Sequence, residues 1–335
     1  MGFIFNFKIM NKAHFLYLLF FTFIISCSKK QDNVLRESSG DINTISVIMN
    51  DALWNGEVGD TLRNKFAAPV IGLPQEEPLF TLNQYADKLV EGFITDSRSI
   101  IVIKKGKNTF FEIKKNKYAA PQTVFHLSGS TTDTLLYLLE KHAPEMIQTL
   151  KKGEIEVVQK NNREALLNPK IFKNKFQIEI EVPETFTYAL QKPRLIWLKK
   201  EITSGSMSLL LYHVPLETIS RKDPIGSIIK MRDSIGNLYI KGKDIQMPMI
   251  TEKGYAPYLS TIQLDNCTTY ESKGTWELKN DFMSGPFINY VIFDKEYRRL
   301  MVIEGFCYSP ADDKRDVMFE LESIIKSVKI IKRKK

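Results

Sequence analysis

The side chains most often used in catalysis are sparse in this chain of 335 residues and do not form a known pattern. After the N-terminal segment there are three histidines, His126, His142 and His213, and none belongs to an HExxH, a CxxC or a His pair four residues apart. The Ser-Gly-Ser segments at 128–130 and 204–206 lack the flanks of a GxSxG nucleophile turn. We therefore assign no catalytic residue and expect no metal and no cofactor.

Polar and aromatic residues between positions 54 and 77 are the strongest candidates for binding. They are Trp54, Asp60, Arg63, Glu76 and Glu77, and together they could form a polar binding corner. Neighbouring residues of an extended segment point to opposite faces, so Glu76 and Glu77 cannot share a proton directly. The alternative is that Asp60 and Arg63 pair one helical turn apart, while the two glutamates occupy a rigid loop.

The N-terminal segment is typical of an exported lipoprotein. Two lysines precede an apolar run from Phe15 to Ile25, which at about 11 residues is shorter than the ~20 that a membrane-spanning helix needs. The run ends in Ile-Ile-Ser-Cys, which resembles the bacterial lipobox, where the cysteine is acylated before cleavage. We predict a signal peptide at 1–26 and lipid attachment at Cys27, which would anchor the protein to the bilayer of the cell membrane or outer membrane, facing the periplasm.

Two further cysteines, Cys267 and Cys307, remain after Cys27. Export exposes a protein to an oxidising compartment, where an even number of cysteines favours bridging. A disulfide between Cys267 and Cys307 is therefore possible, and the alternative is two buried free thiols.

The net charge of +8 does not indicate a nucleic-acid partner. Of 47 basic residues, two lie in the first 26 positions and six in the last ten, where there are no acidic residues, so 39 bases face 39 acids in the body of the chain. Because a nucleic-acid binder needs a basic face on its folded domain, we expect no nucleic acid as partner. The run of bases at 332–335 is interpreted as a solvated tail.

The elements that must position these residues fall into two regions. Residues 27–43 are polar and are predicted to be a flexible tether. An N-terminal α+β domain is expected at 44–160 and a C-terminal α+β domain with a basic tail at 161–335. Strands that are segregated from helices and joined by short turns favour an α+β fold, with two sandwich-like halves and mainly antiparallel sheets. In its run of strands and final helix, the second half resembles the PsbP-like sandwich in outline.

Three finer predictions concern two helices and one strand. A helix is expected from Thr131 to Lys152, with Pro144 kinking or splitting it. Alternating residues predict a strand at Glu154–Gln159. Ser309 is the expected N-cap of the closing helix, because a proline and two aspartates follow it.

Three blocks of sequence carry a resemblance to a known family. Leu53 to Phe80 reads LWNGEVGDTLRNKFAAPVIGLPQEEPLF, Lys273 to Tyr290 reads KGTWELKNDFMSGPFINY, and Leu300 to Asp316 reads LMVIEGFCYSPADDKRD. Together they resemble the uncharacterised Bacteroidota lipoproteins of domain-of-unknown-function family 4837, over essentially all of the mature chain. The resemblance implies a membrane-anchored envelope protein and assigns no catalytic or binding residue. Lys273, Ser284 and Cys307 depart from the family pattern.

These observations favour a non-catalytic binding or scaffold protein of the cell envelope. Its partners would be the lipid bilayer, through acylated Cys27, and an unknown envelope protein or apolar ligand. The alternative is an envelope hydrolase that uses an unrecognised serine or carboxylates, of which Glu76, Glu77 and Asp60 are the candidates.

Overall fold

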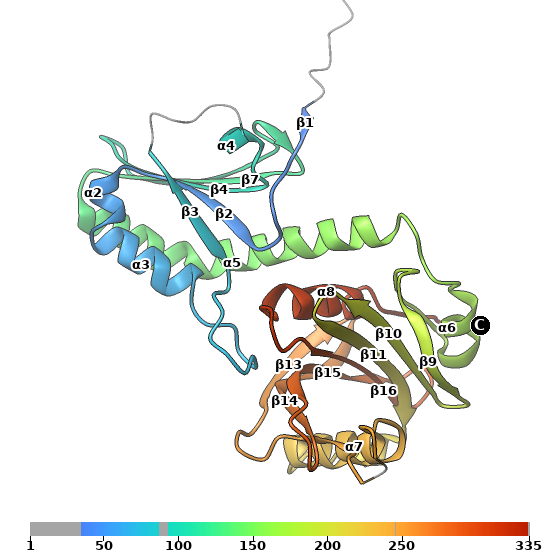
Figure 1. The fold of residues 1–335 in the computed structure, drawn as a ribbon. Coiled ribbons are helices and arrows are strands. Elements are labelled where there is room, and N and C mark those ends of the chain that lie inside the picture. Colours follow the sequence, from blue (N-terminus) through green and yellow to red (C-terminus); the bar gives the residue numbers. More distant parts are fainter. Residues whose placement is uncertain (1–34, 87–92, 245, 334–335) are drawn as a thin grey trace, which may run out of the picture. The chain divides into compact units, whose positions relative to one another are not determined.

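The computed structural model describes residues 35–86, 93–244 and 246–333 (Figure 1). The predicted signal peptide at 1–26, the lipidation site Cys27 and the first part of the predicted tether lie outside these ranges, as do Lys334 and Lys335. Within these ranges, no helix combines the length and the apolar character needed to cross a bilayer.

The described residues from Glu37 onward form one compact unit that contains two large sheets. The elements of its first part, preceded by β1 (Arg36–Glu37), are β2 (Thr44–Ile48), α2 (Asp51–Trp54), α3 (Glu57–Phe66), β3 (Thr81–Tyr85), α4 (Phe93–Asp96), β4 (Ser99–Lys105), β5 (Phe110–Lys115), β6 (Ala119–Ala120), β7 (Thr123–Gly129) and α5 (Thr132–Asn162). The following elements are α6 (Lys170–Phe176), β8 (Ile178–Glu179), β9 (Thr187–Lys192), β10 (Leu195–Ile202), β11 (Gly205–Val214), η2 (Leu216–Thr218), α7 (Pro224–Tyr239), β12 (Met249–Thr251), β13 (Tyr258–Leu264), β14 (Cys267–Leu278), β15 (Ser284–Asp294), β16 (Arg299–Tyr308), α8 (Arg315–Ile325) and β17 (Lys329–Ile330).

The first sheet has the strand order β3-β2-β4-β7-β5. The strand β2 pairs in parallel with β3 and β4, and β4 pairs in parallel with β7, so that β5 alone is antiparallel to its neighbour. The α+β class is confirmed, but the expected antiparallel pairing is wrong for this sheet. Parallel neighbours need crossover connections, and α2 and α3 supply one between β2 and β3.

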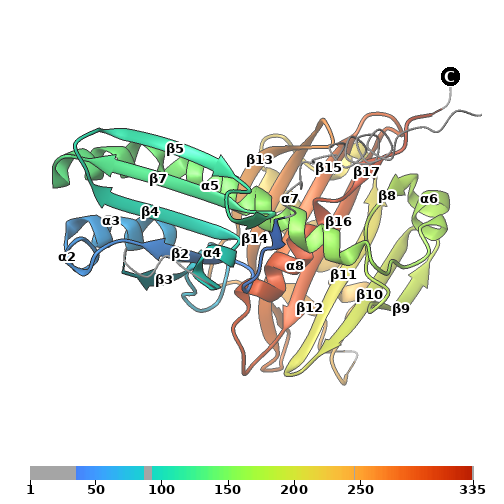
Figure 2. The ribbon, with the colours of Figure 1, turned by 90° about the horizontal axis from the view of Figure 1, so that it is seen from above.

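Two helices cover one face of the first sheet (Figure 2). Alternate residues of β4, such as Ile101 and Ile103, pack on this face against side chains of α3 and α5, including Leu62 and Leu139. Ile100 points to the other face and joins a smaller cluster with Ile94 of α4. Because both faces of β4 are buried, its sequence is a continuous apolar run, as is typical of a parallel strand.

Helix α5 continues unbroken through Pro144 to Asn162, so neither the split at Pro144 nor the strand at 154–159 is present. Leu150, Glu154 and Val158 are all buried. Their spacing of four residues places them on one helical face, which explains why this segment is helical although its residues also alternate. Glu154 pairs with Arg98, with 3.0 Å between its Oε1 and the guanidinium Nε.

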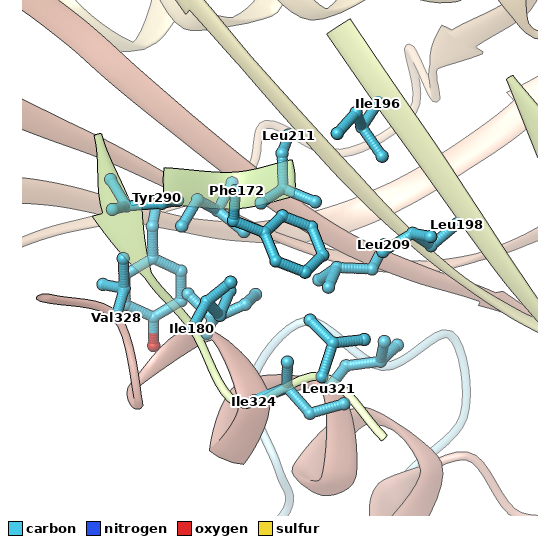
Figure 3. Close-up of a cluster of buried hydrophobic side chains, with 14 of the residues drawn as sticks. Phe172, Ile180, Ile196, Leu198, Leu209, Leu211, Tyr290, Leu321, Ile324 and Val328 are labelled. Atoms are coloured by element: carbon cyan, nitrogen blue, oxygen red, sulfur yellow. The ribbon is translucent and has the colours of Figure 1, made fainter. Parts of the chain in front are cut away.

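The second sheet is antiparallel throughout and has the order β12-β14-β15-β16-β11-β10-β9. Strand β13 also pairs with β14, along the same edge as β12 and opposite the edge that pairs with β15. Its core is formed on both faces. Side chains of α6 and α8, such as Phe172 and Leu321, pack with Leu209 and Leu211 on one face (Figure 3). On the other face, α7 contributes Ile228 to a cluster with strand residues.

The predicted tether ends earlier than residue 43. The amide of Ser39 donates to the Asp96 carbonyl at 2.8 Å, and Arg98 Nη2 donates to the Gly40 carbonyl at 3.0 Å. Asn43 is buried, and its side chain donates to Asp316 Oδ1 at 2.9 Å. Residues 39–43 are thus part of the folded unit.

Candidate binding site

Residues 67–80 connect α3 to β3, and we call them the capping loop because one of their side chains caps α8. The carboxylate of Glu77 accepts the Lys314 amide on both oxygens at 2.9 Å and the Arg315 amide on Oε2 at 2.7 Å. The first amides of a helix have no partner within the helix, and the helix dipole favours negative charge there. Glu77 therefore fills the role predicted for Ser309, and α8 begins five residues after Pro310.

The capping loop is fastened at two further points. Arg315 Nη1 donates to the Pro78 carbonyl at 3.1 Å and to Thr81 Oγ1 at 3.0 Å. At its other end, Gly72 has φ +89°, and a Cβ there would lie 2.7 Å from the Cβ of Lys273 on β14. The loop backbone thus packs directly on the second sheet, and only glycine fits at that contact.

A cluster of charged side chains lies beneath the capping loop. Lys273 Nζ is 3.3 Å from Glu322 Oε2 and 3.5 Å from Glu271 Oε1, and Lys326 Nζ is 2.6 Å from Glu322 Oε1. The hydroxyl of Tyr290 donates to Glu271 and Glu322. Burial alone would raise the pKa of Glu322, but the attraction of Lys273 and Lys326 outweighs it and lowers this pKa to about 2. Glu322 is therefore ionised at neutral pH.

Lys151 of α5 adds a further cation beside this cluster, and its pKa is lowered, chiefly by burial. Together with Glu322, Lys273 and Arg315 it lines a cavity of about 60 Å³. Such a volume holds a few water molecules and no substrate of ordinary size. The cluster therefore supports the capping loop and α8 and is too small to receive a ligand.

A larger hollow lies on the outer side of the capping loop, and we call it the loop–sheet groove. Its volume is about 630 Å³, within the range of ligand sites. One wall is the segment from Pro69 to Glu76, and the other comes from β14 and the residues before and within β13. The exposed fractions of Ile71, Tyr255 and Tyr258 are 56%, 77% and 61%, so large apolar surfaces face the solvent there.

The groove combines these apolar surfaces with negative charge. Glu76, Glu252 and Glu277 all line it. In the residues that line it there is no histidine or cysteine, and nowhere in the described ranges do three His, Cys, Asp or Glu side chains gather as metal ligands do. This arrangement is suited to recognising a cation next to an apolar group.

The five residues predicted as a binding corner lie in three different places. Arg63 pairs with Asp60 at 2.7 Å, and its guanidinium lies 4.6 Å from the centroid of the Trp54 ring. The pairing of Asp60 with Arg63 one helical turn apart is the alternative that the sequence left open. Glu76 lines the groove, whereas Glu77 is buried at α8, as expected for neighbours on an extended segment. The proposed single corner is therefore wrong.

Sequence reasoning missed four site residues, which are Tyr255, Tyr258, Glu252 and Glu277. Their neighbours in sequence are unremarkable, and they become a site only because the capping loop, some 180 residues earlier in the chain, packs beside them. The exposed tyrosines within a Gly-Tyr-Ala-Pro-Tyr segment at 254–258 were the available signal.

Of the two alternatives for Cys267 and Cys307, the structure has the free thiols, with Cys307 buried and Cys267 partly buried. Cys267 is the first residue of β14, whereas the Cys307 carbonyl accepts the indole N–H of Trp276, near the end of the same strand, at 3.1 Å. From 267 to 276 a strand advances roughly 30 Å, far beyond the ~7 Å that a disulfide permits between Cα atoms.

Residues 165–327 match the family model described as domain of unknown function (DUF4837). This segment belongs to the DUF4837 family. Residues 38–163 match a second model, described as domain of unknown function (DUF8532). The resemblance is thus confirmed over the DUF4837 segment, whereas the block Leu53–Phe80 lies in the part that the second model matches.

Comparison with individual proteins adds little to this assignment. No curated protein matches the chain. Among solved structures, the crystal structure of the Saccharomyces cerevisiae Ran-binding protein Mog1p is similar to part of it, with 11% sequence identity, 47% of this chain and 91% of that chain covered, and a TM-score of 0.31. Within the molecule itself, the DUF4837 segment supplies the sheet wall of the groove and the DUF8532 match supplies the capping loop.

Proposed function

We propose that this protein is a lipid-anchored, non-catalytic binding protein of the cell envelope, and that the loop–sheet groove receives an extended, cation-bearing segment of a partner polypeptide. The observation that carries the proposal is the groove itself, which places exposed tyrosines and three carboxylates beside the edge of a sheet. The anchor is supported by the lipobox-like sequence at Cys27.

The edge of the sheet favours an extended polypeptide as the occupant. In the described structure β13 pairs with β14 and with no other strand. The side chains of Tyr258, Leu259, Ser260 and Thr261 are exposed, so both faces of the strand are open to solvent. An edge strand offers unpaired backbone groups to a second chain, and this gives affinity without a deep pocket.

The composition of the groove favours a segment with lysine or arginine next to aliphatic residues. Glu76, Glu252 and Glu277 attract a cation, and Tyr255 and Tyr258 provide ring faces on which its stem can lie. Ile71 extends the apolar surface from the capping loop. Charge complementarity at such a site sets which partner binds and how fast it associates.

The groove can be tested with short labelled peptides and the detergent-solubilised full-length lipoprotein. A peptide that alternates lysine and valine should bind, as measured by fluorescence anisotropy, and one that alternates glutamate and valine should not. The double variant Glu252→Gln/Glu277→Gln should bind the first peptide about tenfold more weakly. Equal binding of the two peptides, or no effect of the double variant, would contradict the proposal.

Photo-crosslinking then locates the contact in native membranes. A photoreactive amino acid at Tyr258 should form adducts that the Glu252→Gln/Glu277→Gln background removes. Tyr137 on α5 is the matched control, because its exposed fraction is also 61%. The same adducts from position 137 would show that contact is nonspecific and that the groove is not the site.

The anchor has a separate test. Cys27→Ala should leave the precursor unprocessed and unlipidated, as measured by labelling with a fatty acid and by gel mobility. If that variant is still lipid-labelled and stays with membranes after carbonate washing, Cys27 is not the anchor. This result would leave the assignment of the groove unaffected.

A further inference from the structure

A pocket of about 430 Å³ lies at the other end of β15 from the loop–sheet groove, and we call it the basic pocket. Its cationic side chains come from separate parts of the DUF4837 segment: Lys175 from the last turn of α6, Arg194 from the turn before β10, and Arg298 and Arg299 from the turn into β16. His213 at the end of β11 completes the wall. The numbers of basic and acidic residues are equal between the two ends of the chain, but positive charge is concentrated locally at this pocket.

Only one of these cations is neutralised by a carboxylate. Arg299 Nε donates to Asp294 Oδ2 at 2.8 Å, and its Nη1 donates to Gln177 Oε1 at 3.1 Å. Lys175 Nζ donates to the Lys192 carbonyl at 2.8 Å, which leaves its charge uncompensated. Arg194 and Arg298 are exposed, and neither has an acidic partner within the described residues.

Two acidic residues of the neighbouring segments have partners outside the pocket. Glu179 pairs with Lys173 at 2.8 Å, and Glu296 accepts the Arg333 amide at 3.0 Å. The guanidinium of Arg333 lies 4.8 Å from the centroid of the Tyr297 ring, so this residue of the basic tail is held beside the pocket. Arg333 is itself exposed, and its charge adds to the positive potential.

Tyr297, beside the pocket, is held by two hydrogen bonds. The Tyr297 amide donates to Asp294 Oδ1 at 3.1 Å, and its hydroxyl donates to the Ile331 carbonyl at 3.0 Å. Arg298, the next residue, adopts φ +54°, which is uncommon for a residue other than glycine. The His213 ring packs edge-on against Phe176, with 6.2 Å between ring centroids.

We propose that the basic pocket binds a phosphate group. Guanidinium groups donate pairs of hydrogen bonds that match phosphate oxygens, and Arg194 and Arg298 have these donors free. The Lys175 ammonium and a ring N–H of His213 can add two more. The volume exceeds that of phosphate alone, so the phosphate can carry a further group, as a small phosphate ester or as the headgroup of a phospholipid.

Equilibrium dialysis tests this with the detergent-solubilised full-length lipoprotein at about 0.15 M salt. The probes are radiolabelled inorganic phosphate and glycerophosphoglycerol, which is the deacylated headgroup of phosphatidylglycerol. Saturable binding of one equivalent of either probe supports the proposal. Preference for inorganic phosphate identifies a free phosphate as the source, and preference for the diester identifies a lipid headgroup.

The variant Arg194→Gln/Arg298→Gln should weaken binding by about tenfold or more, because two charge-assisted donors are lost. Lys104→Gln/Lys107→Gln removes the same charge from exposed positions on and after β4 and should leave binding unchanged. The groove variant Glu252→Gln/Glu277→Gln should also retain it, which separates this proposal from the proposed function. Failure of both probes to bind, or an equal loss in the β4 variant, would overturn the proposal.

A second measurement does not depend on any substitution. Burial, together with the charges of Arg299 and Arg194, lowers the pKa of His213. A phosphate bound between these arginines should raise that pKa toward its usual value, as followed by NMR of the imidazole with and without inorganic phosphate or glycerophosphoglycerol. An unchanged His213 titration at saturating concentrations of both probes would place any bound anion outside the pocket.

Discussion

Glu77 shows how much of the fold depends on one side chain. Glu77 is 5% exposed and its carboxylate accepts two amides at the start of α8, whereas the adjacent Glu76 is exposed. We expect Glu77→Ala to lower the free energy of unfolding by about 2 kcal/mol, because buried amides lose their acceptor. Glu76→Ala, the control, should change it by less than about 0.5 kcal/mol in urea denaturation. Similar losses in the two variants would show that Glu77 is not the cap.

The two thiols of the second sheet should be present and unreactive. Burial raises the pKa of Cys307 to about 12 and also raises the pKa of Cys267. Because the thiolate is the reactive form, both should react slowly with a disulfide reagent such as DTNB in the folded protein. In guanidinium chloride without reductant, Cys267 and Cys307 should both titrate as thiols. No titratable thiol in that assay would mean that a disulfide had formed after all.

At the scale of elements, α7 is joined to the second sheet through a buried ion pair. Arg232 Nη2 lies 2.7 Å from Glu304 Oε1 on β16, both side chains are 1% exposed, and Asn289 also donates to Glu304. Arg232→Met should therefore cost about 3 kcal/mol or more, because it leaves a buried carboxylate without its cation.

A double-mutant cycle checks this interpretation. Adding Glu304→Gln to Arg232→Met removes the stranded charge, so the double variant should be less destabilised than the sum of the two single variants, as measured by urea denaturation. Strict additivity would show that the two side chains do not stabilise each other.

The sequence was informative about elements whose pattern has a single explanation. The proline and the two aspartates after Ser309 predicted a closing helix, and α8 is present there. The segment at 154–159 fits a strand as well as a helix, and only the contact of Glu154 with Arg98 and Ser99 reveals which face is buried. Likewise, Ser309 has every local property of an N-cap, but an acceptor 237 residues away from Lys314 replaces it.

At the scale of the whole molecule, the charged cluster beneath the capping loop should make stability depend on acid pH. The folded pKa of Glu322, about 2, lies below the ~4.3 of an unfolded glutamate, so its contribution is complete above the higher value and is lost as the pH falls toward the lower one. Glu322→Gln should be less stable than the wild type by about 3 kcal/mol at pH 7. The difference should shrink from about pH 4.5 toward pH 2 in urea denaturation, and a constant difference would contradict it.

The candidate sites were less predictable than the elements because each is assembled from distant segments. The groove needs the capping loop beside β13 and β14, and the basic pocket needs the ends of α6, β9, β11 and β15 at one place. Neither site is marked by a short motif in the sequence. A net charge counted along the chain cancels acidic and basic residues that lie far apart in the fold. It therefore did not reveal the basic pocket.

The cap formed by Glu77 has a consequence for the order in which the chain folds. The chain is synthesised from its N-terminus, so the capping loop arrives long before the residues of α8 that it binds. Until then the Glu77 carboxylate stays in water, and the closing contact has a sequence separation of 237 residues. Contacts between residues so far apart in sequence close long loops at a large entropic cost, and they lower the folding rate. The final step of folding should therefore be the docking of α8, and the nascent chain would be vulnerable to proteases until its last 20 or so residues have emerged.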